Sequence, residues 1–150
     1  MKPQTKTLAI SLVAVLVLAI LLYVAIMLLS LPQESEQEIP ENTVTRIIDG
    51  DTFELASGEV VRLICIDAPE LGTTRAEESS DFLFSLIYNK QVRLESDIED
   101  KDAYGRLLRY VYVNSSEGEI FINKALFQEG FASVFRYGND TAKCDEIENN

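Results

Sequence analysis

The sequence has no histidine and no tryptophan, and its only cysteines are Cys65 and Cys144. Without histidine, proton transfer near neutral pH has to rely on carboxylates, water or a bound metal ion. The cysteine spacing and the lack of histidine also exclude a CxxC or Cys/His metal site. Outside the cytoplasm, two thiols can form a disulfide that holds the C-terminal tail against the domain. Two separate thiols, one of them buried, are equally compatible with the sequence.

Acidic residues are absent from the first 31 residues, where Lys2 and Lys6 are the only charged side chains. Residues 8–31 form an uncharged run that exceeds the roughly 20 apolar residues needed for a helix to cross a bilayer. The apolar region of a secretory signal peptide is usually only about 7–15 residues long. The run therefore predicts an uncleaved transmembrane signal anchor. The alternative is a long signal peptide that is removed, which leaves a secreted protein.

The charges on either side of this run indicate its orientation. Residues 1–7 are basic, whereas acidic residues follow residue 31, and positively charged flanks stay on the cytoplasmic side of a membrane. We therefore expect a single-pass protein of the cell membrane with a cytoplasmic N-terminus. Residues 32–42 are polar and acidic and contain two prolines, as is typical of a linker. Residues 43–150 are expected to form the extracytoplasmic domain.

The chain beyond the apolar run is strongly acidic. All 25 acidic residues and 11 of the 13 basic residues follow residue 31, so this part carries a net charge of −14. Such a charge argues against a passive binder of nucleic acid, whose affinity comes largely from Lys and Arg side chains that neutralise phosphates. It is compatible with a local acidic site that recruits a divalent cation, and equally with simple solubility.

The domain is mainly β with helices, an α+β pattern. Strand composition is found in residues 44–48, 52–56, 60–66, 91–96 and 106–113. Helical composition is found in residues 74–88, which begin with a capping box at Thr74 to Glu77, and in residues 121–128, with Gly130 just beyond the end. This order of elements predicts a five-stranded Greek-key barrel of the oligonucleotide-binding (OB) type, preceded by one N-terminal transmembrane helix.

Carboxylates stand where two of the predicted strands begin or end. Asp51 follows the turn after the first strand, and Asp67 ends the third strand just before Pro69. In an OB barrel these two residues can meet, and carboxylates with a backbone carbonyl are hard oxygen ligands suited to Ca²⁺ or Mg²⁺. Glu70 lies three residues beyond Asp67, within reach of a metal-bound water. A purely structural role in turns is the alternative for both aspartates.

Two arginines stand close to these carboxylates in the sequence. Arg62 precedes Asp67 by five residues, an odd separation that puts the two side chains on opposite faces of a regular strand. A bulge or strong curvature is needed if they are to share a site. Arg106 begins the fifth predicted strand. A guanidinium group suits bidentate contact with a phosphate, although surface salt bridges are the alternative in so acidic a domain.

Several ordered segments resemble signatures of the thermonuclease, or staphylococcal nuclease-like, family. They are residues 44–52 (VTRIIDGDT), 61–70 (VRLICIDAPE), 102–112 (DAYGRLLRYVY), 122–126 (INKAL) and 130–132 (GFA). The resemblance extends from about residue 43 to residue 137. Because these segments occur in the same order as the family's signatures, the chain resembles a member of that family.

The resemblance implies a function and a site. The function is that of a Ca²⁺-dependent endonuclease, which hydrolyses phosphodiester bonds in DNA and RNA and leaves 3′-phosphate ends. One Ca²⁺ ion would be held by Asp51, Asp67 and the main-chain carbonyl of Ala68. Glu70 would be the general base that activates water. Arg62 and Arg106 would bind the scissile phosphate, and Tyr104 would contact a substrate phosphate. We expect a monomer that prefers single strands.

Two departures from the family pattern modify these expectations. Ala103 stands where the family has a basic residue before the tyrosine, which predicts weaker substrate binding. Residues 141–148 are expected to form only the first turns of a third helix, so the domain is expected to be truncated there. The alternative functions are a non-catalytic OB-fold binding module at the cell surface and a truncated chain that folds poorly.

Overall fold

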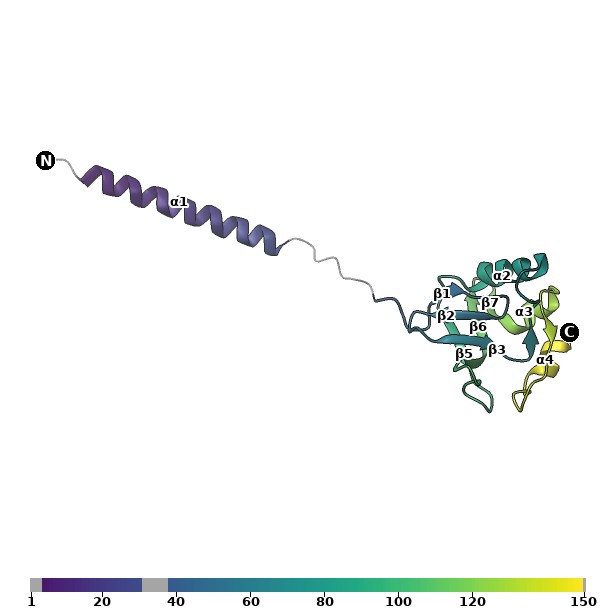
Figure 1. The fold of residues 1–150 in the computed structure, drawn as a ribbon. Coiled ribbons are helices and arrows are strands. Elements are labelled where there is room, and N and C mark those ends of the chain that lie inside the picture. The colour runs from purple at the N-terminus through teal and green to yellow at the C-terminus, as the bar shows by residue number, and fades with distance from the viewer. Residues whose placement is uncertain (1–3, 31–37, 150) are drawn as a thin grey trace. The chain divides into compact units, whose positions relative to one another are not determined.

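The computed structural model describes residues 4–30 and 38–149, with side chains from residue 14 onward. The chain divides into two units, Met1–Gln37 and Glu38–Asn150 (Figure 1). The first contains the helix α1 (Gln4–Leu29), whose side chains at residues 14–29 are exposed. Within the described side chains, 14–30 and 38–149, no helix is both long and apolar enough to span a bilayer. Residue 31, at the end of the predicted anchor, and residues 32–37 of the predicted linker lie outside the described residues.

The second unit combines short strands with three helices. Its strands are β1 (Val44–Ile47), β2 (Thr52–Leu55), β3 (Val60–Leu63), β4 (Ile66–Asp67), β5 (Val92–Glu95), β6 (Leu107–Ser115), β7 (Gly118–Phe121) and β8 (Ser133–Val134). Its helices are α2 (Thr74–Ile87), α3 (Ile122–Gln128) and α4 (Cys144–Glu148). The predicted α+β class is therefore confirmed.

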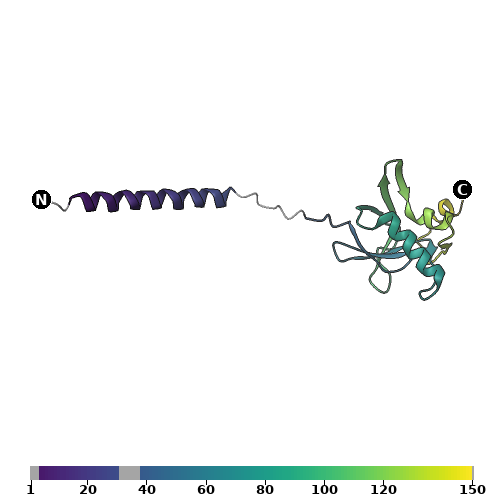
Figure 2. The ribbon, with the colours of Figure 1, turned by 90° about the horizontal axis from the view of Figure 1, so that it is seen from above.

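The main sheet has the strand order β1-β2-β3-β6-β5, with β7 added to β6 as a hairpin. Neighbouring strands are antiparallel except β3 and β6, which are parallel. The sheet closes on itself because Thr43 bridges Gln91 and the Val44 amide donates to the carbonyl of Lys90 at 3.0 Å. This closed order is consistent with the predicted OB barrel. Figure 2 shows α2 lying beside the barrel strands.

Alternating side chains of the strands fill the barrel. In β3 the residues Val61 and Leu63 are buried while Val60 and Arg62 are not fully covered, as the two-residue period of a strand requires. The helices add their apolar stripes to the same core, through Leu83, Ile87, Ile122, Leu126 and Ile147. The core therefore holds the sheet and all three helices of the unit together.

Three details differ from the sequence-based prediction. The predicted strand 60–66 is broken after Leu63, because Cys65 adopts the left-handed backbone conformation with φ of +64°. The cap of α2 is Thr73 rather than Thr74, since the Thr73 Oγ1 accepts the Ala76 amide at 3.2 Å and Thr74 is already helical. The strands β7 and β8 were not predicted; both are short and are held by pairing with β6 and β4.

The structure joins Cys65 and Cys144 by a disulfide whose Cα atoms are 5.1 Å apart. Both residues are buried. The bond connects the segment between β3 and β4 to the start of α4, across 79 residues of sequence. Of the two alternatives that the sequence left open, the structure therefore contains the pairing that holds the C-terminal segment against the domain.

Gly50 lies at a point where the β1–β2 turn, α2 and the residue after β4 come very close together. A Cβ atom at residue 50 would collide with the Ser79 hydroxyl and would lie 2.7 Å from the Cβ of Ala68. The Ser79 hydroxyl is itself buried without a hydrogen-bond partner within the described part of the chain. Glycine is thus required for close packing beside Asp51.

We expect Gly50→Ala to lower the free energy of unfolding by about 2 kcal/mol, because an added methyl group overfills this contact. Guanidinium denaturation of the full chain in mild detergent, followed by tyrosine fluorescence, measures the change. Ser79→Ala is the matched control: it removes a buried hydroxyl without a partner and should leave stability unchanged or slightly raised. A Gly50→Ala variant as stable as the parent would contradict the close approach.

Candidate active site

Arg62 connects the two aspartates that the sequence singled out. Its Nη1 lies 2.9 Å from Asp51 Oδ2, and its Nη2 lies 2.8 Å from Asp67 Oδ1. The same guanidinium donates to the carbonyls of Leu63 at 2.8 Å and Ile66 at 3.0 Å. Only 15% of the Arg62 side chain is exposed. Three hydrogen bonds and the ion pair with Asp51 together hold it in one orientation.

The break at Cys65 is what allows Arg62 and Asp67 to meet. In a regular strand their odd separation would put them on opposite faces. The left-handed residue at position 65 interrupts the strand between them. The side chains of β4 therefore do not continue the alternation of β3, and Asp67 lies on the same side as Arg62. The irregularity that the sequence required therefore exists as a turn between two strands rather than as a bulge within one.

Asp51 is the most buried carboxylate of the site, with 5% of the residue exposed. Its Oδ2 accepts the Ala68 amide at 2.7 Å, and its Oδ1 accepts the Thr52 hydroxyl at 3.0 Å. The Asp49 carboxylate accepts the Asp51 amide and so forms the β1–β2 turn. Burial raises the pKa of Asp51 to about 6, and the Arg62 guanidinium opposes that rise.

Arg106 is held by a turn of its own. The Asp102 carboxylate accepts the Arg106 Nε at 2.6 Å and the backbone amides of Tyr104 at 2.9 Å and Arg106 at 3.0 Å. Partial burial raises the pKa of Asp102, but these hydrogen bonds outweigh it and hold the pKa below its usual value. Gly105 completes the turn with φ of +83°, and the Tyr104 ring lies 5.4 Å from the Arg106 guanidinium carbon.

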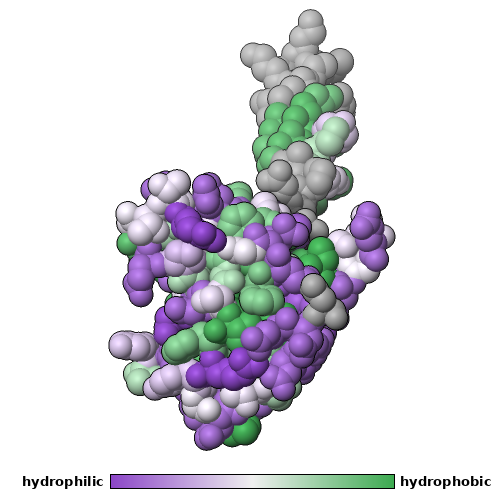
Figure 3. All heavy atoms as spheres, turned by 90° about the vertical axis from the view of Figure 1, so that its right-hand side faces the viewer, coloured by the Kyte–Doolittle hydropathy of each residue, from purple (hydrophilic) through white to green (hydrophobic). Residues whose placement is uncertain are grey.

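Two hollows surround these side chains. A pocket of about 430 Å³ is lined by both arginines, by Tyr104 and Lys101, and by the aromatic rings of Phe135 and Tyr137. A second hollow of about 310 Å³ is lined by Asp67, Ala68, Glu70 and Arg75 among others. Figure 3 shows one face of this unit, where hydrophilic side chains surround a smaller group of hydrophobic ones.

The predicted site residues are therefore brought together in two groups. Arg62, Arg106 and Tyr104 share the larger pocket, whereas Asp67, Ala68 and Glu70 share the smaller one. The ion pair between Arg62 and Asp67 connects the groups. Glu70 is exposed and lies three residues before the cap of α2, where its carbonyl accepts the Thr73 hydroxyl at 3.1 Å.

The donor set beside Arg62 fits a hard divalent cation. Asp51 and Asp67 offer carboxylate oxygens, and main-chain carbonyls complete such sites for Ca²⁺ or Mg²⁺. Both carboxylates already pair with one positive group, the Arg62 guanidinium. Within residues 14–30 and 38–149, however, no group of three or more His, Cys, Asp and Glu side chains is placed to hold a metal. Carbonyl or water ligands would have to supply the remainder.

Sequence reasoning missed Asp102 as a functional side chain. It was noted only as the first residue of a motif, yet its carboxylate orients both Tyr104 and Arg106. An aspartate two residues before a tyrosine and three before a glycine is a local sign of such a turn. The contribution of Asp140, described below, had no comparable signal because its partners are more than 40 residues away.

Comparison with known proteins supplies an independent line of evidence. Residues 60–150 match the family model described as "Staphylococcal nuclease homologue". The chain belongs to this family. The matched range includes Arg62, Asp67, Glu70 and Arg106, whereas Asp51 lies before it.

Individual relatives are similar over most of this nuclease homologue. The thermonuclease of Staphylococcus hyicus is 34% identical over 70% of this chain and 65% of its own length, and that of Staphylococcus intermedius is 39% identical over 63% and 59%. Endonuclease YncB of Bacillus subtilis (strain 168) is 30% identical over 76% of this chain and 57% of its own length. The chain thus spans less than two thirds of these relatives.

The raised pKa of Asp51 predicts that its ionised carboxylate lowers the free energy of unfolding in a pH-dependent way. The folded state binds this proton more tightly than the unfolded state, whose pKa is 3.8. The ionised carboxylate therefore opposes folding above about pH 6, and this cost disappears below about pH 4. In EDTA, Asp51→Asn should be more stable than the parent at pH 7.5, by up to about 3 kcal/mol. Denaturation at pH 7.5 and pH 4.5 measures the difference, and an advantage that does not shrink at the lower pH would contradict the assignment.

Proposed function

We propose that this staphylococcal nuclease homologue is a Ca²⁺-dependent endonuclease that hydrolyses phosphodiester bonds in DNA and RNA and leaves 3′-phosphate ends. The observation that carries the proposal is the position of Arg62. It is bonded to two carboxylates suited to a divalent cation and lines one pocket with a second arginine. A cation site beside paired guanidinium groups matches the charge that develops during attack on a phosphodiester.

The divalent cation would be held by Asp51, Asp67 and the Ala68 carbonyl. When bound, such an ion stabilises negative charge and helps to orient water and phosphate. The same ion would compete with Arg62 for the two carboxylates and would free part of the guanidinium for the substrate. The close contact at Gly50 supports this role, because it keeps Ala68 beside the turn that carries Asp51.

The remaining roles follow from the exposure and orientation of each side chain. Glu70 is exposed in the smaller hollow, where its carboxylate can orient the attacking water and accept its proton. Arg62 and Arg106 both line the larger pocket, where guanidinium groups suit contact with the scissile phosphate; the terminal nitrogens of Arg62 are bonded to Asp51, Asp67 and two carbonyls until a cation takes the carboxylates. The Asp102 carboxylate holds Arg106 through Nε, which leaves its terminal nitrogens for the phosphate.

The aromatic rings of the larger pocket support a preference for single strands. Tyr104 is 86% exposed and Tyr137 is 74% exposed, and both line the pocket with Phe135. Exposed rings can stack on unpaired bases, which a duplex hides inside its helix. The phenolic hydroxyl of Tyr104 can also donate a hydrogen bond to a substrate phosphate. A monomer would suffice for this function, since all of the assigned groups come from one chain.

We further propose that residues 8–31 anchor the protein in the cell membrane with the nuclease domain outside. The support is the uncharged sequence run, the charges that flank it and the helix α1. Secretion after signal cleavage is the alternative. Fractionation of the producing cells, followed by protease treatment of intact cells, separates the two locations.

The proposed activity predicts that chelation abolishes cleavage and that two single substitutions slow it strongly. The full chain in mild detergent should cut single-stranded DNA with Ca²⁺ and not with EDTA. Arg106→Ala should lower kcat by about 10²-fold or more, since a preorganised positive charge is lost. Glu70→Gln should lower it by about 10²–10⁴-fold, since proton transfer is lost. Products should gain a free 3′-hydroxyl only after phosphatase treatment.

Matched controls remove the same charges elsewhere. Arg46→Ala and Glu78→Gln change exposed side chains away from both hollows and should retain the parental rate. A folded protein that cleaves neither DNA nor RNA with Ca²⁺ would reject the nuclease and leave a non-catalytic binding module. Loss of activity in the controls as well would reject the assignment of the site.

A further inference from the structure

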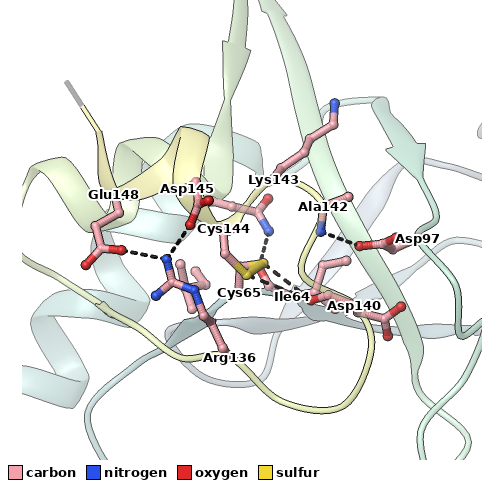
Figure 4. The surroundings of a disulfide bond; sticks show 12 residues. Ile64, Cys65, Asp97, Arg136, Asp140, Ala142, Lys143, Cys144, Asp145 and Glu148 are labelled. Carbon is pink, nitrogen blue, oxygen red and sulfur yellow. Dashed lines mark hydrogen bonds and ion pairs between the residues drawn. A yellow bond between two sulfur atoms is a disulfide. The ribbon is translucent and has the colours of Figure 1, made fainter.

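The C-terminal segment, residues 135–144, contacts the turn that follows the strand of Arg62 and the loop that leads to Arg106. On one side the Phe135 amide donates to the carbonyl of Cys65 at 3.0 Å, and the disulfide joins Cys65 to Cys144. Figure 4 shows the two sulfur atoms among Ile64, Asp140 and the start of α4. The segment therefore holds Cys65 by a hydrogen bond and by a covalent bond.

Cys65 in turn determines where Arg62 is held. The backbone of Cys65 has φ of +64°, a conformation that costs energy for a residue with a side chain and persists only when its surroundings impose it. The carbonyls on either side, those of Leu63 and Ile66, both accept the Arg62 Nη1. If residue 65 relaxed to a strand conformation, these two carbonyls would separate. The Asp67 side chain would then point to the opposite face of the strand from Arg62.

The other side of the segment holds the loop that leads to Arg106. The Asp140 Oδ1 accepts the amides of Ile98 at 2.8 Å and Glu99 at 2.9 Å, and only 4% of Asp140 is exposed. In return, the Asp97 carboxylate accepts the Ala142 amide at 2.9 Å (Figure 4). The loop continues directly into the Asp102 turn, so Asp140 supports the base of the structure that orients Arg106.

Asp140 and the disulfide also contact each other. The Asp140 carbonyl oxygen lies 3.5 Å from the Cys65 sulfur and 3.9 Å from the Cys144 sulfur. These are packing contacts, because sulfur atoms in a disulfide carry no proton to donate. The covalent bond and the carboxylate that holds the second loop thus belong to one packed cluster.

Lys143 also attaches this segment to the barrel strands: its amide donates to the Tyr110 hydroxyl at 3.0 Å, and its Nζ donates to the Tyr112 hydroxyl at 2.7 Å and pairs with Glu95 at 2.8 Å. The neighbouring elements of the segment are short, with two residues in β8 and five in α4. The ion pairs of Arg136 with Asp145 and Glu148 are exposed to solvent, and such pairs contribute little to stability. The contacts of Lys143 are with β5 and β6, whereas the disulfide is the covalent connection between the segment and the turn beside Arg62.

We propose that the Cys65–Cys144 disulfide and Asp140 are positioning residues for Arg62 and Arg106, so that opening the disulfide lowers activity without unfolding the barrel. The proposal rests on the nuclease function proposed above. A dithiol reductant opens the bond in two exchange steps: it supplies two electrons and two protons, leaves Cys65 and Cys144 as thiols and becomes a cyclic disulfide itself. The enzyme would therefore be weak in a reducing compartment and active after export into an oxidising one.

The first experiment follows kcat, KM and secondary structure of the full chain in mild detergent as the ratio of reduced to oxidised dithiothreitol is varied. We expect kcat on single-stranded DNA to fall by at least about tenfold, because misplaced catalytic groups lose rate faster than binding. The midpoint of this loss should coincide with that of thiol appearance, and reoxidation should restore the rate. Circular dichroism should change little through the transition.

A second variant separates positioning from the disulfide itself. Asp140→Ala, with the disulfide intact, should also lower kcat by about tenfold. Asp145→Ala is the matched control: it removes an exposed carboxylate of the same part of the chain and should retain the parental rate. Full activity of the folded, reduced protein would overturn the proposal. Cooperative loss of all structure on reduction would also overturn it, since the bond would then hold the whole fold.

A spectroscopic readout keeps this test independent of catalysis. The Nε–Hε signals of Arg62 and Arg106 in ¹⁵N-labelled protein should shift on reduction, while the amide signals of β2 and β5 stay in place. If the parent cleaves nothing yet these signals shift, the positioning role stands and the nuclease function fails. If the parent cleaves and the signals do not move, the positioning role fails and the nuclease function stands.

Discussion

The ion pairs of Arg62 with Asp51 and Asp67 are the interaction on which the site depends. A buried carboxylate such as Asp51 is costly, and Arg62, the Ala68 amide and the Thr52 hydroxyl reduce that cost without removing it, since its pKa remains raised. The same guanidinium reaches Asp67 and so ties β4 to the barrel. One side chain therefore connects two parts of the fold and supplies the positive charge that the proposed phosphate recognition would use.

This arrangement requires a backbone conformation that an isolated strand would not adopt. Cys65 interrupts the strand between Arg62 and Asp67 with a left-handed residue, and its strain has to be balanced by contacts elsewhere. The disulfide to Cys144 and the hydrogen bond from Phe135 supply them. The C-terminal segment is thus part of the site, although no residue in it was expected to take part in the chemistry.

The charges of the pocket limit how the proposed polyanionic substrate would reach so acidic a domain. Each arginine is accompanied by carboxylates of its own, Arg62 by Asp51 and Asp67, and Arg106 by Asp102. The pocket therefore has no strong positive field to attract nucleic acid over a distance. Recognition would depend instead on short-range geometry: oriented guanidinium forks, exposed aromatic rings and a divalent cation held between the carboxylates.

The sequence by itself determined the order of the main strands and helices and the residues that form the site. Alternating apolar residues, turn glycines and motif order are local signals, and they singled out Arg62, Asp67 and Arg106; the structure pairs Arg62 with Asp67 and places Arg62 and Arg106 in the lining of one pocket. The tertiary structure decided the left-handed turn at Cys65, the pairing with Cys144 and the support from Asp140. These features arise from contacts between residues far apart in the sequence, so no local pattern of composition or spacing could reveal them.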